Sequence, residues 1–431
     1  MQTSPKNTMP DWKKTFMTIW AGQAVSMLTS SVLQMSIVWY LTMRTESAAI
    51  LTLATLTGFL PRAVLGSFCG TIVDRYDRKR VMIAADLFIA AASSLLAVAG
   101  AFGEIPIWLI FAVLFLRSIG AAFHYPSLHA STPLIVPREQ LTKYAGYSQG
   151  FESISMVISP GLAALLYGIW KLNVIVLLDI LGAIAAVSLL LFVKLERPAR
   201  EQACSRSLLA ETREGIDAAR REPGIISLMI VSALYAIVYF PIGTLYPLIT
   251  MTHFHGGYRE SGIVETLFSL GLLLGAVLLS RIGQRINRPR AFLWSIGLYG
   301  AGILLTGLLP PAGLPIFMAL SLINGLSVPF YSGVRTAIFQ HRIEERYLGR
   351  VLALCSSATM AAMPLGLLLA GSFAEVIGVA TWFSISGILT MLLAGVSALL
   401  PSFRLLITDD YHTKKSAEKS GKNDDITDTE C

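Results

Sequence analysis

Long apolar runs separated by short polar segments account for almost all of the chain. A helix that crosses a bilayer needs about 20 mostly apolar residues, and the pattern predicts twelve helices of that kind. They are expected at residues 15–41, 47–71, 81–102, 105–127, 143–168, 172–194, 225–251, 260–281, 291–309, 313–339, 349–374 and 379–403. The predicted fold class is therefore an all-α polytopic membrane protein.

The composition also indicates that lipid is the solvent. Of the 431 residues, 54% are hydrophobic and 14% are charged, whereas about a quarter of a typical soluble domain is charged. The first apolar run follows Lys13 and Lys14, and it is too long for the apolar region of a cleavable signal peptide. We therefore expect it to remain in the protein as a spanning helix.

The distribution of lysine and arginine predicts the orientation. With a cytoplasmic N-terminus, 28 of the 34 cationic residues fall in cytoplasmic segments and three in outer loops, while Arg62, Arg117 and Arg335 lie within helices. Cytoplasmic loops of membrane proteins carry such an excess, so both termini are expected inside. The same bias explains the net charge of +7 without a nucleic-acid partner.

A polar, basic segment divides the chain into two halves. We expect an N-terminal six-helix bundle at 1–194, a cytoplasmic central loop at 195–224 with a partly helical pattern, a C-terminal six-helix bundle at 225–404 and a disordered cytoplasmic tail at 405–431. The fourth span carries Gly120 and Tyr125, and the tenth carries Gly325 and Tyr331. Such an echo is expected of two pseudo-symmetric repeats.

Ionisable residues inside predicted spans are functional candidates, because each costs roughly 2.5–3.5 kcal/mol to insert at a helix centre. Arg117 lies near the middle of the fourth helix, where it either forms a structural ion pair or organises proton coupling. Asp179 in the sixth helix, Glu152 in the fifth and Glu265 in the eighth are proton-carrier candidates. Burial favours a protonated carboxyl and a nearby arginine favours the ionised form, so alternation between these surroundings would bind and release a proton.

Two further charged residues are expected near the cytoplasmic face. Asp86, early in the third helix, is expected to pair with the cluster Arg78–Arg80 and to help close an inner gate. Arg335 is expected to extend towards the cytoplasmic surface.

Aromatic and amide side chains are candidates for a substrate cavity, namely Gln34, Phe123, Tyr235, Tyr239, Asn324 and Tyr331. For Tyr235 and Tyr239, one turn apart on the seventh helix, core packing is the favoured alternative. Few amides or charges lie within the spans, which favours a large amphipathic ligand. Because the sequence shows no P-loop, no metal-ligand spacing and no catalytic set, we expect neither an enzyme nor a cofactor.

One polar loop carries a family resemblance. The segment GTIVDRYDRKR, Gly70 to Arg80, resembles the loop between helices two and three of the major facilitator superfamily, as do Arg117 with Gly120 and the twelve spans. Runs at 16–42, 58–83, 117–149 and 327–340 are similar to the bacterial macrolide-efflux, Mef-type, drug exporters. The chain departs from these patterns at three positions. Asp77 stands where the superfamily commonly has glycine, and Arg62 stands where the Mef-type exporters have an uncharged residue. Ser159 replaces the glycine that precedes proline in the antiporter motif of the superfamily.

The resemblance implies macrolide export across the bacterial cytoplasmic membrane, driven by the proton-motive force through alternating access. The partners that it implies are an amphipathic drug, protons and the lipid bilayer. It also implies a cytoplasmic gating motif made of Gly70, Asp74, Arg75, Arg78, Lys79 and Asp86.

Two alternatives stay open at this point. The same fold could carry another amphipathic drug or metabolite. Alternatively, a non-transporting membrane protein could work with an ATPase partner in resistance, with the central segment and the tail as docking surfaces.

Overall fold

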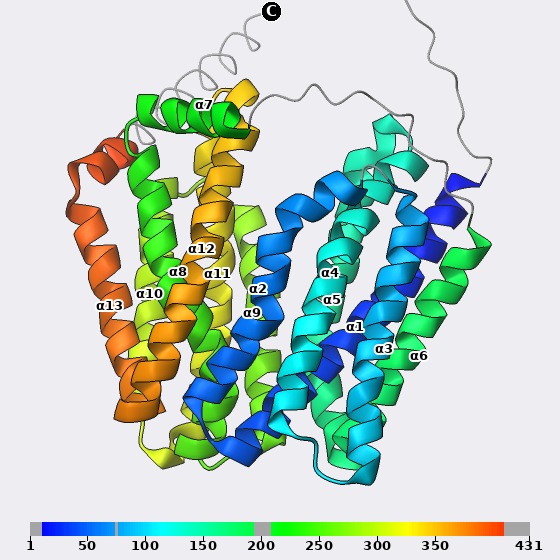
Figure 1. Cartoon of the computed structure of the whole chain (residues 1–431). Coiled ribbons are helices and arrows are strands. Elements are labelled where there is room, and N and C mark those ends of the chain that lie inside the picture. Colours follow the sequence, from blue (N-terminus) through cyan, green and yellow to red (C-terminus); the bar gives the residue numbers. More distant parts are fainter. Residues whose placement is uncertain (1–10, 74–75, 194–207, 409–431) are drawn as a thin grey trace, which may run out of the picture. The chain divides into compact units, whose positions relative to one another are not determined.

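The structure is a computed structural model that describes residues 11–73, 76–193 and 208–408. The described residues form thirteen α-helices, labelled in Figure 1. They are α1 (Trp12–Thr45), α2 (Ala48–Val73), α3 (Arg78–Phe102), α4 (Ile107–Ile135), α5 (Leu141–Ile169), α6 (Leu172–Phe192), α7 (Leu208–Arg221), α8 (Ile225–Leu248), α9 (Tyr258–Ile282), α10 (Arg288–Leu308), α11 (Leu314–Arg342), α12 (Glu345–Ile377) and α13 (Val379–Leu399).

Twelve of the thirteen helices are long and apolar enough to cross a membrane. They correspond one to one with the predicted spans, so the prediction of twelve spanning helices is confirmed. The observed helices extend past several predicted ends, as in α1, which begins three residues earlier and ends four residues later than expected. Polar residues continue these helices beyond the apolar run from which each was predicted.

The remaining helix, α7, lies in the segment predicted as a partly helical central loop. Its buried residues Gly215, Ala218 and Ala219 follow helical spacing. It packs against α12, where Glu214 Oε2 lies 2.7 Å from Arg350 Nη1. This short amphipathic helix is therefore anchored to a spanning helix by apolar packing and an ion pair.

The chain forms two compact units, the first made of Met1–Ala203 with Tyr246–Thr266 and the second of Cys204–Leu245 with Leu267–Cys431. In the first half of the chain α3 packs against α4 and α6, and α1 packs against α5 and α6. In the second half α10 packs against α11 and α13 in the same way. The pairing of α10 with α11 and α13 thus repeats the pairing of α3 with α4 and α6.

Small residues allow close contact between neighbouring helices, as is common in membranes. Gly22 and Gly182 lie where α1 meets α6, and a Cβ at Gly182 would overlap the Thr29 side chain. Gly120 of α4 lies against Ile89 of α3, and Gly325 of α11 lies against the Phe268 carbonyl of α9. The two glycines of the predicted echo thus both mark close helix packing.

We expect Gly182→Val to destabilise the first unit, because overpacking costs about 1–3 kcal/mol and the new side chain would overlap Thr29. The measurement is the apparent unfolding temperature of the detergent-purified protein. Gly395→Val on α13 is the matched control, since a Cβ there would meet no atom within 4 Å. Equal unfolding temperatures for wild type and Gly182→Val would contradict the close contact of α1 with α6.

Candidate functional site

A buried ion pair joins α4 and α6 in the first unit. Arg117 Nη1 lies 2.5 Å from Asp179 Oδ2, and the two residues are only 9% and 2% exposed. Arg117 lies ten residues into α4 and Asp179 seven residues into α6, so both are within spanning segments. Two residues that the sequence presented as separate candidates therefore form one compensated pair.

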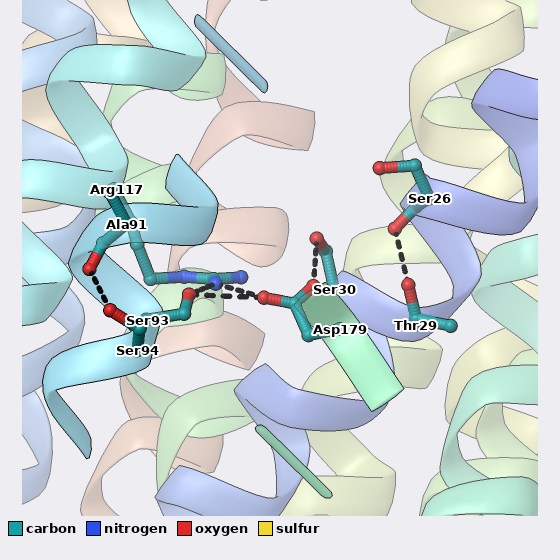
Figure 2. A network of polar contacts seen from close by, with 8 residues as sticks. All are labelled: Ser26, Thr29, Ser30, Ala91, Ser93, Ser94, Arg117 and Asp179. Carbon is teal, nitrogen blue, oxygen red and sulfur yellow. Dashed lines mark hydrogen bonds and ion pairs between the residues drawn. The ribbon is translucent and has the colours of Figure 1, made fainter. Parts of the chain in front are cut away.

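Two serines complete the polar network drawn in Figure 2. Ser30 Oγ of α1 donates to Asp179 Oδ1 at 2.6 Å, and Ser93 Oγ of α3 donates to Asp179 Oδ2 at 3.1 Å. Arg117 Nη1 also donates to Ser93 Oγ. Four helices thus contribute one residue each to this network, and the sequence analysis missed both serines because serine is common in spanning helices.

A second buried acid–base pair lies on α3 and α4, and it corrects the expectation for Asp86. Asp86 Oδ1 lies 3.2 Å from His124 Nε2, and Asp86 Oδ2 accepts a hydrogen bond from Gln23 Nε2 at 3.3 Å. All three residues are buried. The expected pairing with the cluster Arg78–Arg80 is wrong, because Asp86 lies two turns inside α3 with its carboxylate directed to α4 and α1.

The cations of that cluster bind elsewhere. Arg78 Nη1 donates to the Ala130 carbonyl at 2.5 Å, and Lys79 Nζ donates to the carbonyls of Leu191 and Val193 at 3.0 and 2.6 Å. Asp77, a departure from the family pattern, caps α3 by accepting from the backbone N–H groups of Lys79 and Arg80. Of the remaining gating candidates, Gly70 lies in the last turn of α2, and Asp74 and Arg75 lie outside the described residues.

A third acid–base pair lies between α4 and α5. Glu152 Oε1 is 3.2 Å from His129 Nε2, and Glu152 Oε2 accepts from Gln149 Nε2 at 3.4 Å. The pair is more open than the other two, because the His129 side chain is 51% exposed. Glu265 on α9 is half-buried in the same unit.

Both histidine partners were missed by sequence reasoning, although a signal existed. His124 lies seven residues after Arg117, so two helical turns place both side chains on the same face of α4. A histidine that lies two turns from an arginine on the same face of a spanning helix therefore indicates a second buried acid–base pair.

The aromatic cavity candidates of the second unit gather in one cluster. The Tyr235 ring stacks on Tyr239 at 5.5 Å and lies 4.5 Å from Tyr331, and Tyr299, missed from the sequence, lies 5.8 Å from Tyr235. Arg335, which was expected to extend to the surface, instead donates to Tyr331 Oη at 2.8 Å. Tyr235, Tyr299 and Tyr331 are buried, whereas Tyr239 is half-buried.

The other cavity candidates lie apart from this cluster in the chain. Asn324 is buried on α11, where its side chain faces Gly302 of α10. In the first unit, Phe123 is half-buried on α4 and Gln34 is exposed on α1. Among the described residues, no three His, Cys, Asp or Glu side chains are grouped so that they could hold a metal ion.

Comparison with known proteins agrees with this architecture. The family model for transmembrane secretion effectors matches residues 7–423. The chain is 47% identical over 397 residues to macrolide efflux protein A from Streptococcus pyogenes, which covers 92% of this chain and 98% of that protein.

Two solved structures show the same fold. A bacterial homologue of the human lysosomal transporter Spinster superposes with a TM-score of 0.68 at 14% identity, covering 95% of this chain and 99% of that one. A D-xylose–proton symporter superposes with a TM-score of 0.66 at 12% identity, covering 90% and 97% of the two chains. The predicted fold class, a major facilitator fold of twelve spans, is thereby confirmed.

The twelve apolar spans and the bacterial relatives make this a multi-pass protein of the bacterial cell membrane. Its fold and relatives are those of transporters. Because the family model covers nearly the whole chain and the streptococcal relative shares almost half of its residues, the chain belongs to the transmembrane secretion effector family of the major facilitator superfamily.

Proposed function

We propose that this protein exports macrolide antibiotics from the bacterial cell and so confers resistance to them. The observation that carries the proposal is its similarity, over nearly the full length, to a protein named for macrolide efflux. Outward movement of a drug against its gradient needs an energy source. Since the sequence contains no P-loop, we infer that the proton-motive force drives export.

Buried charge supports proton coupling in the first unit. Asp179 is compensated by Arg117 at 2.5 Å and by donors from two further helices. We infer that a conformational change that separates this pair leaves Asp179 able to accept a proton, and that restoring the pair releases it. Glu152, which has a histidine partner, and Glu265 are further candidates for the same role.

We infer alternating access from the two pseudo-symmetric halves, since repeats of this kind rock around a central site in transporters. The charge bias supports cytoplasmic termini. The loop Gly70–Arg80 then lies at the cytoplasmic face, where Asp74, Arg75 and Arg78 act as the gating motif.

For the substrate, we infer that partly exposed candidates contact the drug. Phe123 and Tyr239 are half-buried and Gln34 is exposed, whereas Tyr235, Asn324 and Tyr331 are buried among their neighbours. The half-buried aromatic rings offer apolar faces to an amphipathic ring system, and the buried ones support their positions.

The first test is accumulation of labelled erythromycin in a susceptible bacterium that expresses the chain. We expect low accumulation that a protonophore restores to the level of cells without the protein, because export stops when the proton gradient collapses. The measurement is repeated in a host that lacks a resistance ATPase, which tests whether export needs such a partner. Unchanged accumulation with the protein present in the membrane would contradict macrolide export and direct attention to other amphipathic compounds.

The second test is Asp179→Asn, measured as erythromycin export in the same cells. We expect export to fall by about tenfold or more, because removing one member of a buried ion pair leaves Arg117 uncompensated at a cost of about 3–5 kcal/mol. Asp217→Asn on the exposed surface of α7 is the matched control, and membrane abundance is measured for both. Normal export by Asp179→Asn would remove this residue from the coupling mechanism.

The third test is Asp74→Asn, measured as turnover and as drug binding by the purified protein. We expect turnover to fall by about tenfold, with binding affinity changed by less than about twofold, because a gate changes the rate of interconversion rather than the drug contacts. An unaltered transport rate would count against the gating role.

A further inference from the structure

The polar residues of the first unit form two layers that repeat after seven residues. The first layer contains Ser30, Ser93, Arg117 and Asp179, and the second contains Gln23, Asp86 and His124. On each of α1, α3 and α4 the two layers are seven residues apart in sequence, which is about two helical turns or about 10.5 Å along the helix axis. On α6 the corresponding position is Ala186, which lies against Gly22 of α1.

Apolar packing separates the two layers. Ile89 lies three residues after Asp86 on α3, and it fills the space beside Gly120 of α4, which lies four residues before His124. Because a Cβ at Gly120 would overlap Ile89, this contact is tight. The second layer is therefore a site of its own, with its own acid and its own base.

The bases of the two layers, Arg117 and His124, differ in whether they can lose a proton. Arginine keeps its proton in proteins, so a proton added to Asp179 would leave the Arg117 cation without compensation. An imidazole can be either neutral or protonated, with a hydrogen-bond donor on one or on both ring nitrogens. A proton added at His124 creates an imidazolium beside the Asp86 carboxylate, so the protonated state of this layer is the compensated one.

Gln23 can hydrogen bond to Asp86 whether His124 is neutral or protonated. Its Nε2 donates to Asp86 Oδ2 at 3.3 Å, while His124 Nε2 faces the other carboxylate oxygen at 3.2 Å. When the imidazole is neutral, the amide still supplies a hydrogen bond to the buried carboxylate. Asp86 therefore keeps one hydrogen-bond donor in either protonation state of His124.

The other charged groups near His124 each have a partner of their own. In the first layer, Arg117 and Asp179 compensate each other. Towards the other end of α4, His129 is paired with Glu152 of α5. From α2, Arg62 lies over the Tyr125 ring at 5.6 Å, and that ring lies 6.4 Å from the His124 ring. Among the described α1 residues in these layers, Gln23 and Ser30 are uncharged.

We propose that Gln23, Asp86 and His124 form a second proton-binding site of the first unit, in which His124 takes up and releases one proton in each export cycle with Asp86 as its counter-ion. The proposal rests on proton-coupled export as proposed above, and it adds a site two turns away from Asp179. The proton binds to an imidazole nitrogen, and no covalent intermediate is involved.

The first experiment measures the proton site without any drug. The full-length protein in lipid nanodiscs is labelled with ¹⁵N-histidine, and the signal that His124→Gln removes is assigned to His124. We expect a pH series of the wild-type protein to show His124 in both its neutral and its imidazolium form. A His124 signal that stays in one protonation state at every pH at which the protein remains folded would overturn the proposal, whatever the protein transports.

The second experiment separates proton coupling from drug binding in proteoliposomes. We expect His124→Gln to lose roughly tenfold or more of the erythromycin accumulation driven by a pH gradient, since an amide carries no exchangeable charge. Exchange of labelled for unlabelled erythromycin without a gradient is expected to stay within about twofold of wild type. His341→Gln, the same substitution at an exposed position at the end of α11, is the matched control.

A double variant covers the case in which His124→Gln fails to fold with Asp86 left uncompensated. Asp86→Asn with His124→Gln removes both charges, which is tolerated far better than removal of one, and we expect exchange to continue while gradient-driven accumulation is lost. Gradient-driven accumulation at the wild-type level by this double variant would overturn the proposal. Failure of wild type to move erythromycin at all would instead count against the proposed function, with the titration still deciding the proton site.

Discussion

Compensation of buried charge is the constraint on which the first unit depends. Helix α4 carries three basic side chains, and each faces an acid from a different helix: Arg117 faces Asp179 of α6, His124 faces Asp86 of α3, and His129 faces Glu152 of α5. A lone charge inside a spanning helix is costly, so the two buried pairs favour the helix rotations that turn Arg117 towards Asp179 and His124 towards Asp86. Losing one partner of a buried pair costs about 3–5 kcal/mol, a large fraction of a typical folding free energy.

The two halves share a packing plan but use it for different chemistry. Pairing of the third span with the fourth and sixth recurs as pairing of the ninth with the tenth and twelfth. Helix α4, the fourth span, carries basic side chains that pair with acids on other helices. Helix α11, the tenth span, instead contributes Tyr331 to a cluster of tyrosines that includes Tyr235, Tyr239 and Tyr299. Among the described residues, the first unit thus gathers charge pairs along α4, and the second gathers tyrosine rings around α8, α10 and α11.

The three pairs on α4 also differ in how readily each gives up its charge. The guanidinium of Arg117 stays protonated, so this pair changes state only when its members separate. His124 differs from Arg117 in that an imidazole also has a neutral form. The His129–Glu152 pair is open to its surroundings, since His129 is 51% exposed. Along α4 the basic side chains thus run from a buried guanidinium to an exposed histidine.

The sequence alone determined the number of spans, because runs of about 20 apolar residues have one stable solution in a bilayer, and the resemblance of the Gly70–Arg80 loop already indicated the superfamily. Isolated charges such as Arg117 and Asp179 were also visible, since any ionisable residue in an apolar run is conspicuous. Their partners were decided only by the tertiary structure. Asp86 was assigned to nearby cations by proximity in sequence, whereas the rotation of α3 directs it to His124 and Gln23, which are 38 and 63 residues away. Hydrophobic pattern records which residues enter the membrane, but pairing depends on how the helices are rotated about their axes, and that is set by contacts between segments far apart in the chain.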